Sequence, residues 1–156
     1  GAAGLVGGPL ADAVHQLKTR DRPAIAAALG RWAAASAPEV GDAVVTSVPL
    51  GRRRRLERGY DQAALLARSV AAQLELPRAA RMLRRIRESP PQVGRSRDAR
   101  RRNVHGAFAA SPAAKGANVL LIDDVITTGA TANACAEALK QAGARAVTVL
   151  ALARAD

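Results

Sequence analysis

The residues best suited to chemistry lie between Asp123 and Thr131, where two adjacent carboxylates precede a short turn of hydroxyl and small residues. Asp123 and Asp124 can accept hydrogen bonds from vicinal sugar hydroxyls or hold a hydrated Mg²⁺. The backbone amides and hydroxyls of such a turn suit a phosphate group. The sequence therefore predicts a ribose 5-phosphate site, whose phosphate would be held by Thr127, Thr128, Gly129, Ala130 and Thr131.

Two elements must position these residues. The apolar run 119–122 predicts a strand buried on both faces of a parallel sheet, and 130–142 has the pattern of a helix. A strand-to-helix junction directs backbone N–H groups and the positive end of the helix dipole at one place. We therefore expect the acids and the turn to meet at the carboxyl edge of the sheet.

A second strand is predicted over 43–48, and it ends at a turn that leads into four consecutive arginines. Ligands of open α/β sheets bind beyond the carboxyl ends of the strands. This turn could therefore clamp a pyrophosphate group through Leu50, Gly51, Arg52 and Arg53. Further along, 59–62 opens a helix that runs to about Leu74, an edge strand is expected over 82–87, a short strand over 104–108 and a final buried strand over 146–151.

Composition narrows the class of protein. The 156 residues fit a single domain, and with 49% hydrophobic but 2% aromatic residues the core must consist of Ala, Val and Leu. We expect an α/β fold in which helices flank a parallel sheet of four or five strands. One cysteine, Cys135, excludes an internal disulfide and a multi-cysteine zinc site, and we expect its thiol to be buried and inert. No apolar run could span a membrane, which favours a cytoplasmic protein without membrane insertion.

The net charge of +11 is concentrated in the middle third of the chain, where 16 arginines face five acids between Arg52 and Arg102. Such a segment predicts a surface for a polyanion, and both a polyphosphate and a nucleic acid fit it. Within this segment 88–102 is rich in proline, glycine and arginine and too polar to pack stably. A solvated basic loop is one interpretation of it.

These motifs also resemble a known family. The stretch 119–131 resembles the phosphoribosyl pyrophosphate (PRPP) signature of type I phosphoribosyltransferases. Three further motifs resemble the ComF competence subfamily and its amidophosphoribosyltransferase-like fold: Val48-Pro49-Leu50 with Arg58-Gly59-Tyr60-Asp61-Gln62, Pro90-Pro91-Gln92, and Arg101-Arg102-Asn103-Val104-His105-Gly106-Ala107-Phe108. The match covers nearly the whole chain. Members usually carry an N-terminal four-cysteine zinc ribbon, which is absent or removed here, and commonly hold Asn where Asp61 stands.

The resemblance implies a Rossmann-like type I phosphoribosyltransferase fold that binds PRPP with Mg²⁺ carried by the ligand. It assigns the ribose hydroxyls and the catalytic environment of C1′ to Asp123 and Asp124. It also implies that 88–102 is a mobile basic lid, with Arg95, Arg97, Arg101 and Arg102 on its surface. Relatives serve natural competence and DNA uptake, so single-stranded DNA and a competence helicase are expected partners.

The sequence leaves the activity open among three readings. The protein could transfer the phosphoribosyl group as a pentosyltransferase, bind PRPP as an effector without turnover, or bind single-stranded DNA. Clustered arginines favour the last reading, but Tyr60 is the only aromatic residue between Arg52 and Arg102, so base stacking is not expected. No residue identifies an incoming nucleophile.

Overall fold

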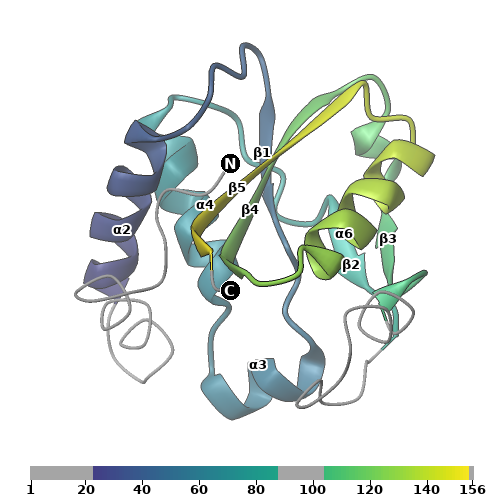
Figure 1. The fold of residues 1–156 in the computed structure, drawn as a ribbon, viewed down its shortest axis with the longest axis horizontal. Coiled ribbons are helices and arrows are strands. Elements are labelled where there is room, and N and C mark those ends of the chain that lie inside the picture. The colour runs from purple at the N-terminus through teal and green to yellow at the C-terminus, as the bar shows by residue number, and fades with distance from the viewer. Residues whose placement is uncertain (1–22, 88–103, 155–156) are drawn as a thin grey trace.

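A parallel sheet in the order β1–β4–β5 forms the centre of the protein in the computed structural model, which describes residues 23–87 and 104–154 (Figure 1). Its strands are β1 (Val44–Ser47), β4 (Asn118–Ile126) and β5 (Ala146–Arg154). β4 pairs with β1 from Val119 to Ile122 and with β5 along its length. Because the strands are parallel, their carboxyl ends share one edge, and the α/β class expected from the sequence is confirmed.

Beside β1, on the side away from β4, the chain forms a single isolated parallel bridge and not a fourth strand. The N–H of Val45 donates to the oxygen of Pro77 (2.8 Å), and the N–H of Ala79 donates to the oxygen of Val45 (2.9 Å), which makes one parallel bridge at Arg78. The expectation of four or five strands is therefore wrong for the described residues. Pro77 lacks an N–H group, so a longer ladder cannot form there.

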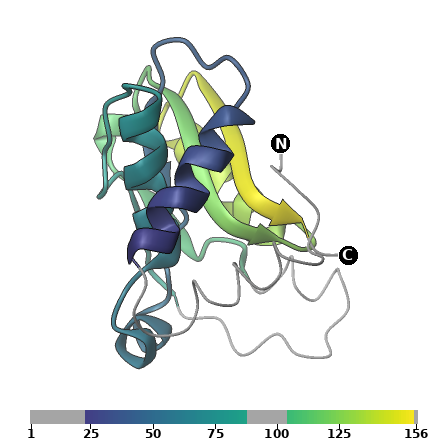
Figure 2. The same cartoon turned by 90° about the vertical axis from the view of Figure 1, so that its left-hand side faces the viewer.

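Two helices, α2 (Pro23–Ala35) and α4 (Gln62–Gln73), lie side by side on one face of the sheet (Figure 2). Leu66 and Val70 of α4 are buried against the sheet with Leu120 and Ile122 of β4. The two helices approach closely at a pair of small residues. A Cβ added at Gly30 would lie 2.3 Å from the Cβ of Ser69, whose hydroxyl donates to the oxygen of Ala27 (2.9 Å).

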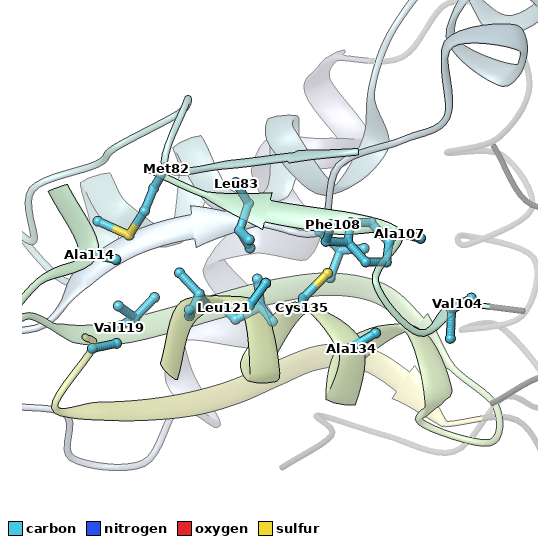
Figure 3. Close-up of a cluster of buried hydrophobic side chains, with 14 of the residues drawn as sticks. Met82, Leu83, Val104, Ala107, Phe108, Ala114, Val119, Leu121, Ala134 and Cys135 are labelled. Carbon is cyan, nitrogen blue, oxygen red and sulfur yellow. The ribbon is translucent and has the colours of Figure 1, made fainter. Parts of the chain in front are cut away.

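The opposite face packs against α6 (Ala130–Gln141) and an antiparallel ribbon of β2 (Leu83–Arg85) and β3 (Phe108–Ala110). Figure 3 shows Leu121 of β4, Cys135 of α6 and Phe108 of β3 within one buried cluster. Burial raises the pKa of the Cys135 thiol, with the charge of Asp123 as a smaller cause. The expectation of a buried cysteine is confirmed. A short 3₁₀ helix, η1 (Pro112–Ala114), joins β3 to β4.

Several local expectations are adjusted by the structure. The strand expected over 104–108 begins instead at Phe108, because the chain turns at Gly106, whose φ is +64°, and the N–H of Ala107 donates back to the oxygen of Val104 (3.1 Å). The edge strand expected over 82–87 is confirmed as β2.

The arginine run, to which sequence patterns assign no element, forms a short helix, α3 (Arg52–Arg58). It starts after Gly51 in an extended conformation and ends at Gly59, whose φ is +78° and whose N–H donates to the oxygen of Arg55 (2.8 Å). Figure 1 shows α3 beyond the carboxyl ends of the strands. Within 23–87 and 104–154, three large apolar residues are exposed: Trp32 of α2 (41%), Leu56 of α3 (76%) and Ile86 (53%). Among the described residues, no helix is long and apolar enough to cross a membrane.

Candidate functional site

The acid pair lies in the last part of β4, inside the paired strand. Asp123 is buried at 8% exposure, and Asp124 is partly buried. One Asp123 oxygen, Oδ1, accepts the N–H of Asp124 (2.9 Å), and Asp124 Oδ1 accepts the N–H of Val125 (2.8 Å). Each carboxylate therefore uses one oxygen to fix its own orientation. The two carboxyl groups also interact with each other, and their remaining oxygens can receive a hydroxyl donor or a cation.

The electrostatics of this pair are unfavourable without a ligand. Burial is the main cause that raises the pKa of Asp123 well above its usual value, and the negative charge of Asp124 adds to it. The charge of Asp61 raises the pKa further, whereas the hydrogen bond from the Asp124 amide lowers it. Two neighbouring carboxylates thus act on the buried Asp123. Cations or hydroxyl donors would relieve this strain, because both favour the ionised form.

The turn that follows the acids forms the start of α6. Gly129 is the N-cap residue with φ of +75°, and as a glycine it supplies no capping side chain. Thr128 Oγ1 accepts the N–H of Ala130 at 3.4 Å, a long hydrogen bond. Thr127 is exposed and Thr131 partly buried. The start of a 12-residue helix whose N-cap residue has no side chain, with hydroxyls beside it, is suited to an anion.

The turn after β1 lies beside the acid pair, because the parallel strands β1 and β4 end at the same edge of the sheet. Ser47 pairs with Ile122, the residue before Asp123, and the N–H of Val48 donates to the oxygen of Ile122 (2.9 Å). The chain then passes through Leu50 and Gly51 into α3. The structure therefore brings Leu50 and Gly51 to the same edge as Asp123, Asp124 and the α6 turn.

The predicted arginines are placed differently. Arg52 and Arg53 are exposed on α3, and Arg53 Nε donates to Glu57 Oε1 at 2.8 Å in an ion pair between side chains that are 76% and 54% exposed. This pair satisfies Arg53 on the helix surface, so its predicted pyrophosphate contact would require a change of partner. Arg95, Arg97, Arg101 and Arg102 and the lid expected over 88–102 lie outside the described residues.

The residues on either side of 88–103 contact each other. The N–H of Ile86 donates to the oxygen of Ala107 (2.8 Å), and Arg87 Nε donates to the oxygen of Gly106 (3.2 Å). Arg87 Nη2 also donates to the oxygen of His105. Backbone and side-chain hydrogen bonds thus extend the β2–β3 ribbon up to Arg87.

Sequence reasoning missed the contribution of Asp61 and Gln62. Asp61 is the N-cap residue of α4, and its Oδ1 accepts the N–H of Ala64 (3.0 Å). Its Oδ2 accepts the N–H of Leu50 (3.2 Å). An acidic residue directly before an apolar helix is the signal of such a cap. Gln62 is buried at 2% exposure, and its amide nitrogen has no partner among the described residues.

A metal can be held here only with help from a ligand. Across residues 23–87 and 104–154 there is no group of three or more His, Cys, Asp and Glu side chains that could hold an ion. Asp123 and Asp124 supply carboxylate oxygens, the donor type that Mg²⁺ prefers, and phosphate oxygens and water would have to complete an octahedral shell. The donor set therefore fits Mg²⁺ that arrives with a polyphosphate.

Comparison with solved structures identifies the same fold elsewhere. The protein superposes on glutamine PRPP amidotransferase from B. subtilis with a TM-score of 0.60 at 23% identity, covering 89% of this chain and 30% of that one. It superposes on an allosteric regulatory enzyme of purine biosynthesis with a TM-score of 0.58 at 22% identity. The chain spans under a third of these enzymes, and the likeness concerns the fold alone.

Sequence relatives are closer. The chain is 35% identical over 154 residues to DNA utilization protein YhgH of Salmonella typhimurium, and 34% identical to that of Escherichia coli. Both matches cover 94% of this chain and 67% of the relative. Competence protein F of Haemophilus influenzae is 35% identical over 114 residues, which is 71% of this chain and half of that protein. The phosphoribosyl transferase domain model matches residues 61–156. The chain therefore belongs to the type I phosphoribosyltransferase family, among its ComF-like members.

Proposed function

We propose that the protein binds PRPP together with Mg²⁺ at the carboxyl edge of the sheet and serves in the handling of incoming DNA. One observation carries the proposal: the acid pair of β4, the start of α6 and the turn after β1 meet at this edge. The names of the relatives, DNA utilization protein and competence protein, support the cellular context.

Each part of the ligand has a matching part of the site. The 5-phosphate would accept hydrogen bonds from the first-turn amides of α6 and from Thr127, Thr128 and Thr131. The ribose hydroxyls would donate to the outer oxygens of Asp123 and Asp124. The diphosphate would lie against the turn at Leu50 and Gly51, and bound Mg²⁺ would offset its charge.

If the bond at C1′ breaks, the protein acts mainly through electrostatics. A sugar that loses diphosphate becomes cationic, and the carboxylates of Asp123 and Asp124 favour positive charge nearby. The same carboxylates hold the sugar in place during the displacement. No residue is assigned as a base for the incoming nucleophile. The same bound complex would therefore serve either a transferase or a protein that binds PRPP as an effector.

Calorimetric titration with PRPP and Mg²⁺ tests the assignment. We expect wild type to bind and the Asp123→Asn/Asp124→Asn double variant to lose binding, because amides neither attract the cation nor accept as many hydroxyl donors. An Asp42→Asn variant removes an acid at the amino edge of the sheet and should bind normally. Equal affinity of the double variant and wild type would refute the pocket.

An assay of pyrophosphate release distinguishes a transferase from a protein that binds PRPP as an effector. Wild type is incubated with PRPP, Mg²⁺ and a panel of purine and pyrimidine bases and amines, and released pyrophosphate is measured. Release that depends on one acceptor shows a transferase. Binding without release for the whole panel supports a protein that reads PRPP as an effector.

Contact with single-stranded DNA is the second candidate function, and α3 is the observation that favours it. The arginine run forms a helix beyond the strand ends, with exposed side chains at Arg52 and Arg55. Phosphates neutralised by such residues release counterions, so binding would weaken steeply with salt. Exposed Leu56 on the same helix offers an apolar contact to a base.

The test compares salt dependence between two matched variants. Arg52→Gln/Arg55→Gln should lower the slope of log affinity against log salt by about 1.4, since each single-strand phosphate contact contributes about 0.7. Lys115→Gln/Arg145→Gln removes the same charge from exposed residues near the amino ends of β4 and β5 and should keep the wild-type slope. Equal slopes for all three proteins would exclude α3 as the DNA contact.

A further inference from the structure

We infer that Asp61 is a positioning residue, whose carboxylate holds the turn at Leu50 and Gly51 against the site and so sets the affinity for the diphosphate end of the ligand. This inference rests on the proposed function and assigns a role to a residue outside the acid pair and the α6 turn. Asp61 does not touch the ligand in this scheme.

Both oxygens of Asp61 are used, and they bind two different elements. Oδ1 accepts the N–H of Ala64 in the first turn of α4 (3.0 Å), and Oδ2 accepts the N–H of Leu50 (3.2 Å). Leu50 precedes α3 and Asp61 follows it, so the Asp61 carboxylate joins the two ends of the segment that contains this helix. The turn after β1 is thereby held at Leu50 as well as at Val48, whose N–H donates to Ile122 of β4 (2.9 Å).

A helix cap alone does not account for this residue. Capping requires one side-chain oxygen, and serine or threonine supply it as well as aspartate does. A carboxylate close to a site for a polyanion also repels the ligand. The structure offsets that cost by giving the charge two N–H donors, one of them at the positive end of α4. The second oxygen is what distinguishes Asp61 from a plain cap, and it is the one that binds the turn.

The acid pair is within reach of the same charge. The charge of Asp61 is the smallest of the causes that raise the pKa of the buried Asp123. The turn at Leu50, the cap of α4 and the diol-binding acids therefore form one connected cluster. A loosened turn would leave the phosphate cradle of α6 intact, since the N–H groups of that helix do not depend on Asp61.

The experiment uses two ligands that differ only in the diphosphate. Affinities for PRPP with Mg²⁺ and for ribose 5-phosphate are measured by calorimetry on wild type, Asp61→Ser and Asp61→Asn. Serine keeps one oxygen for the cap, and asparagine keeps the shape but replaces one oxygen with an amide that cannot accept an N–H. Each variant is expected to lose about 5- to 10-fold in PRPP affinity and none in ribose 5-phosphate affinity.

Asp42→Ala serves as the matched control, because Asp42 Oδ1 also accepts a side-chain hydrogen bond, from Asn118 Nδ2 at 2.6 Å, but at the amino end of β4. It should leave both affinities unchanged. Faster hydrogen exchange of the Leu50 amide in the Asp61 variants would confirm that the bond to the turn was lost.

The outcomes separate the two claims. If wild type binds both ligands but the Asp61 variants keep full PRPP affinity, or lose both affinities equally, the positioning role is refuted and the proposed function stands. If wild type binds neither ligand, the proposed function fails and the inference falls with it.

Discussion

Asp123 combines two roles that conflict with each other. Its place in the last part of β4 directs a carboxylate at the ligand edge, yet burial and two neighbouring acids make its ionised form unfavourable. A residue selected only for stability at this position would be apolar, like Leu121 two residues earlier on the same face. The site therefore keeps a local cost that a bound cation or hydroxyl pair would relieve.

Replacing this acid should stabilise the free protein in a pH-dependent way. Because the pKa of Asp123 is raised in the folded state, the folded protein binds more protons than the unfolded chain above the ordinary pKa of 3.8. Stability contributed by the protonated acid is present below that value and is lost as pH rises through the folded pKa. Asp123→Asn should unfold at a higher temperature than wild type at neutral pH, with the gap closing towards pH 4.

Thermal unfolding followed by circular dichroism across this pH range measures the effect. Asp42→Asn controls for the loss of one acid elsewhere. Parallel curves for wild type and Asp123→Asn would contradict the burial argument. PRPP affinity should show the opposite trend and increase with pH, since the ligand favours the ionised acid.

Gln62 has a buried amide nitrogen with no partner in the described part of the chain. An unpaired buried donor costs about 1–3 kcal/mol, so an apolar side chain of similar size should be better tolerated. We expect Gln62→Met to raise the free energy of unfolding by about 1 kcal/mol in urea titrations. Gln73→Met, at an exposed position of the same helix, should change it little. A loss of stability in Gln62→Met would mean that the amide is satisfied in solution.

At the scale of elements, the start of α6 depends on a left-handed residue. Gly129 has φ of +75°, and a Cβ there would meet only Ile126 at 4.0 Å, so conformation and not space requires glycine. Gly116 has nearly the same φ, +73°, with nothing within 4 Å, and it lies before the amino end of β4. The chain thus offers two equivalent turns at opposite edges of the sheet.

This pair separates strain from function. Alanine at either position should lower the free energy of unfolding by roughly 1–2 kcal/mol. Only Gly129→Ala should also weaken PRPP binding, because a shift to negative φ would turn the first amides of α6 away from the phosphate. Calorimetry and urea unfolding of both variants provide the comparison. Equal PRPP affinity in the two variants would argue against the phosphate cradle.

The crossing of α2 and α4 depends on two small residues in contact. Gly30→Ala places a methyl group 2.3 Å from the Cβ of Ser69, so the helices must move apart despite the better helix propensity of alanine. We expect a loss of about 1–3 kcal/mol in the free energy of unfolding. Adding Ser69→Gly should recover part of it, and the single Ser69→Gly variant controls for the lost hydroxyl. Strict additivity of the two changes would show that the helices do not meet there.

At the scale of the whole molecule, the sequence predicted what local patterns determine. The run into Asp123 and Asp124, the helix after Gly129 and the buried Cys135 all follow from hydrophobic pattern and turn chemistry. The helical state of the arginine run does not follow from such patterns. It depends on Gly51 and Gly59 at the two ends of the run and on the hydrogen bond from Leu50 to Asp61, which both lie outside it. The second oxygen of Asp61 was equally out of reach, since its partner lies 11 residues away.

Charge shows the same difference between chain and molecule. The arginines of the middle third that the structure describes are divided among separate elements: α3 beyond the strand ends, α4, the bridge beside β1 and the β2 strand. Arg68, Arg78 and Arg84 are all exposed, yet they belong to three different elements. Within residues 23–87 and 104–154 the arginines therefore do not form one basic face, and there α3 is the element that concentrates arginine near the candidate site.

The position of Trp32 determines what optical methods can detect in this protein. It is the only tryptophan of the chain, partly exposed near the end of α2, from which the chain enters β1 at the amino edge. Indole emission will therefore respond to the surroundings of α2 and remain almost unchanged when a ligand occupies the opposite edge. A tryptophan introduced in place of exposed Leu56 on α3 would supply the missing fluorescent signal for that edge.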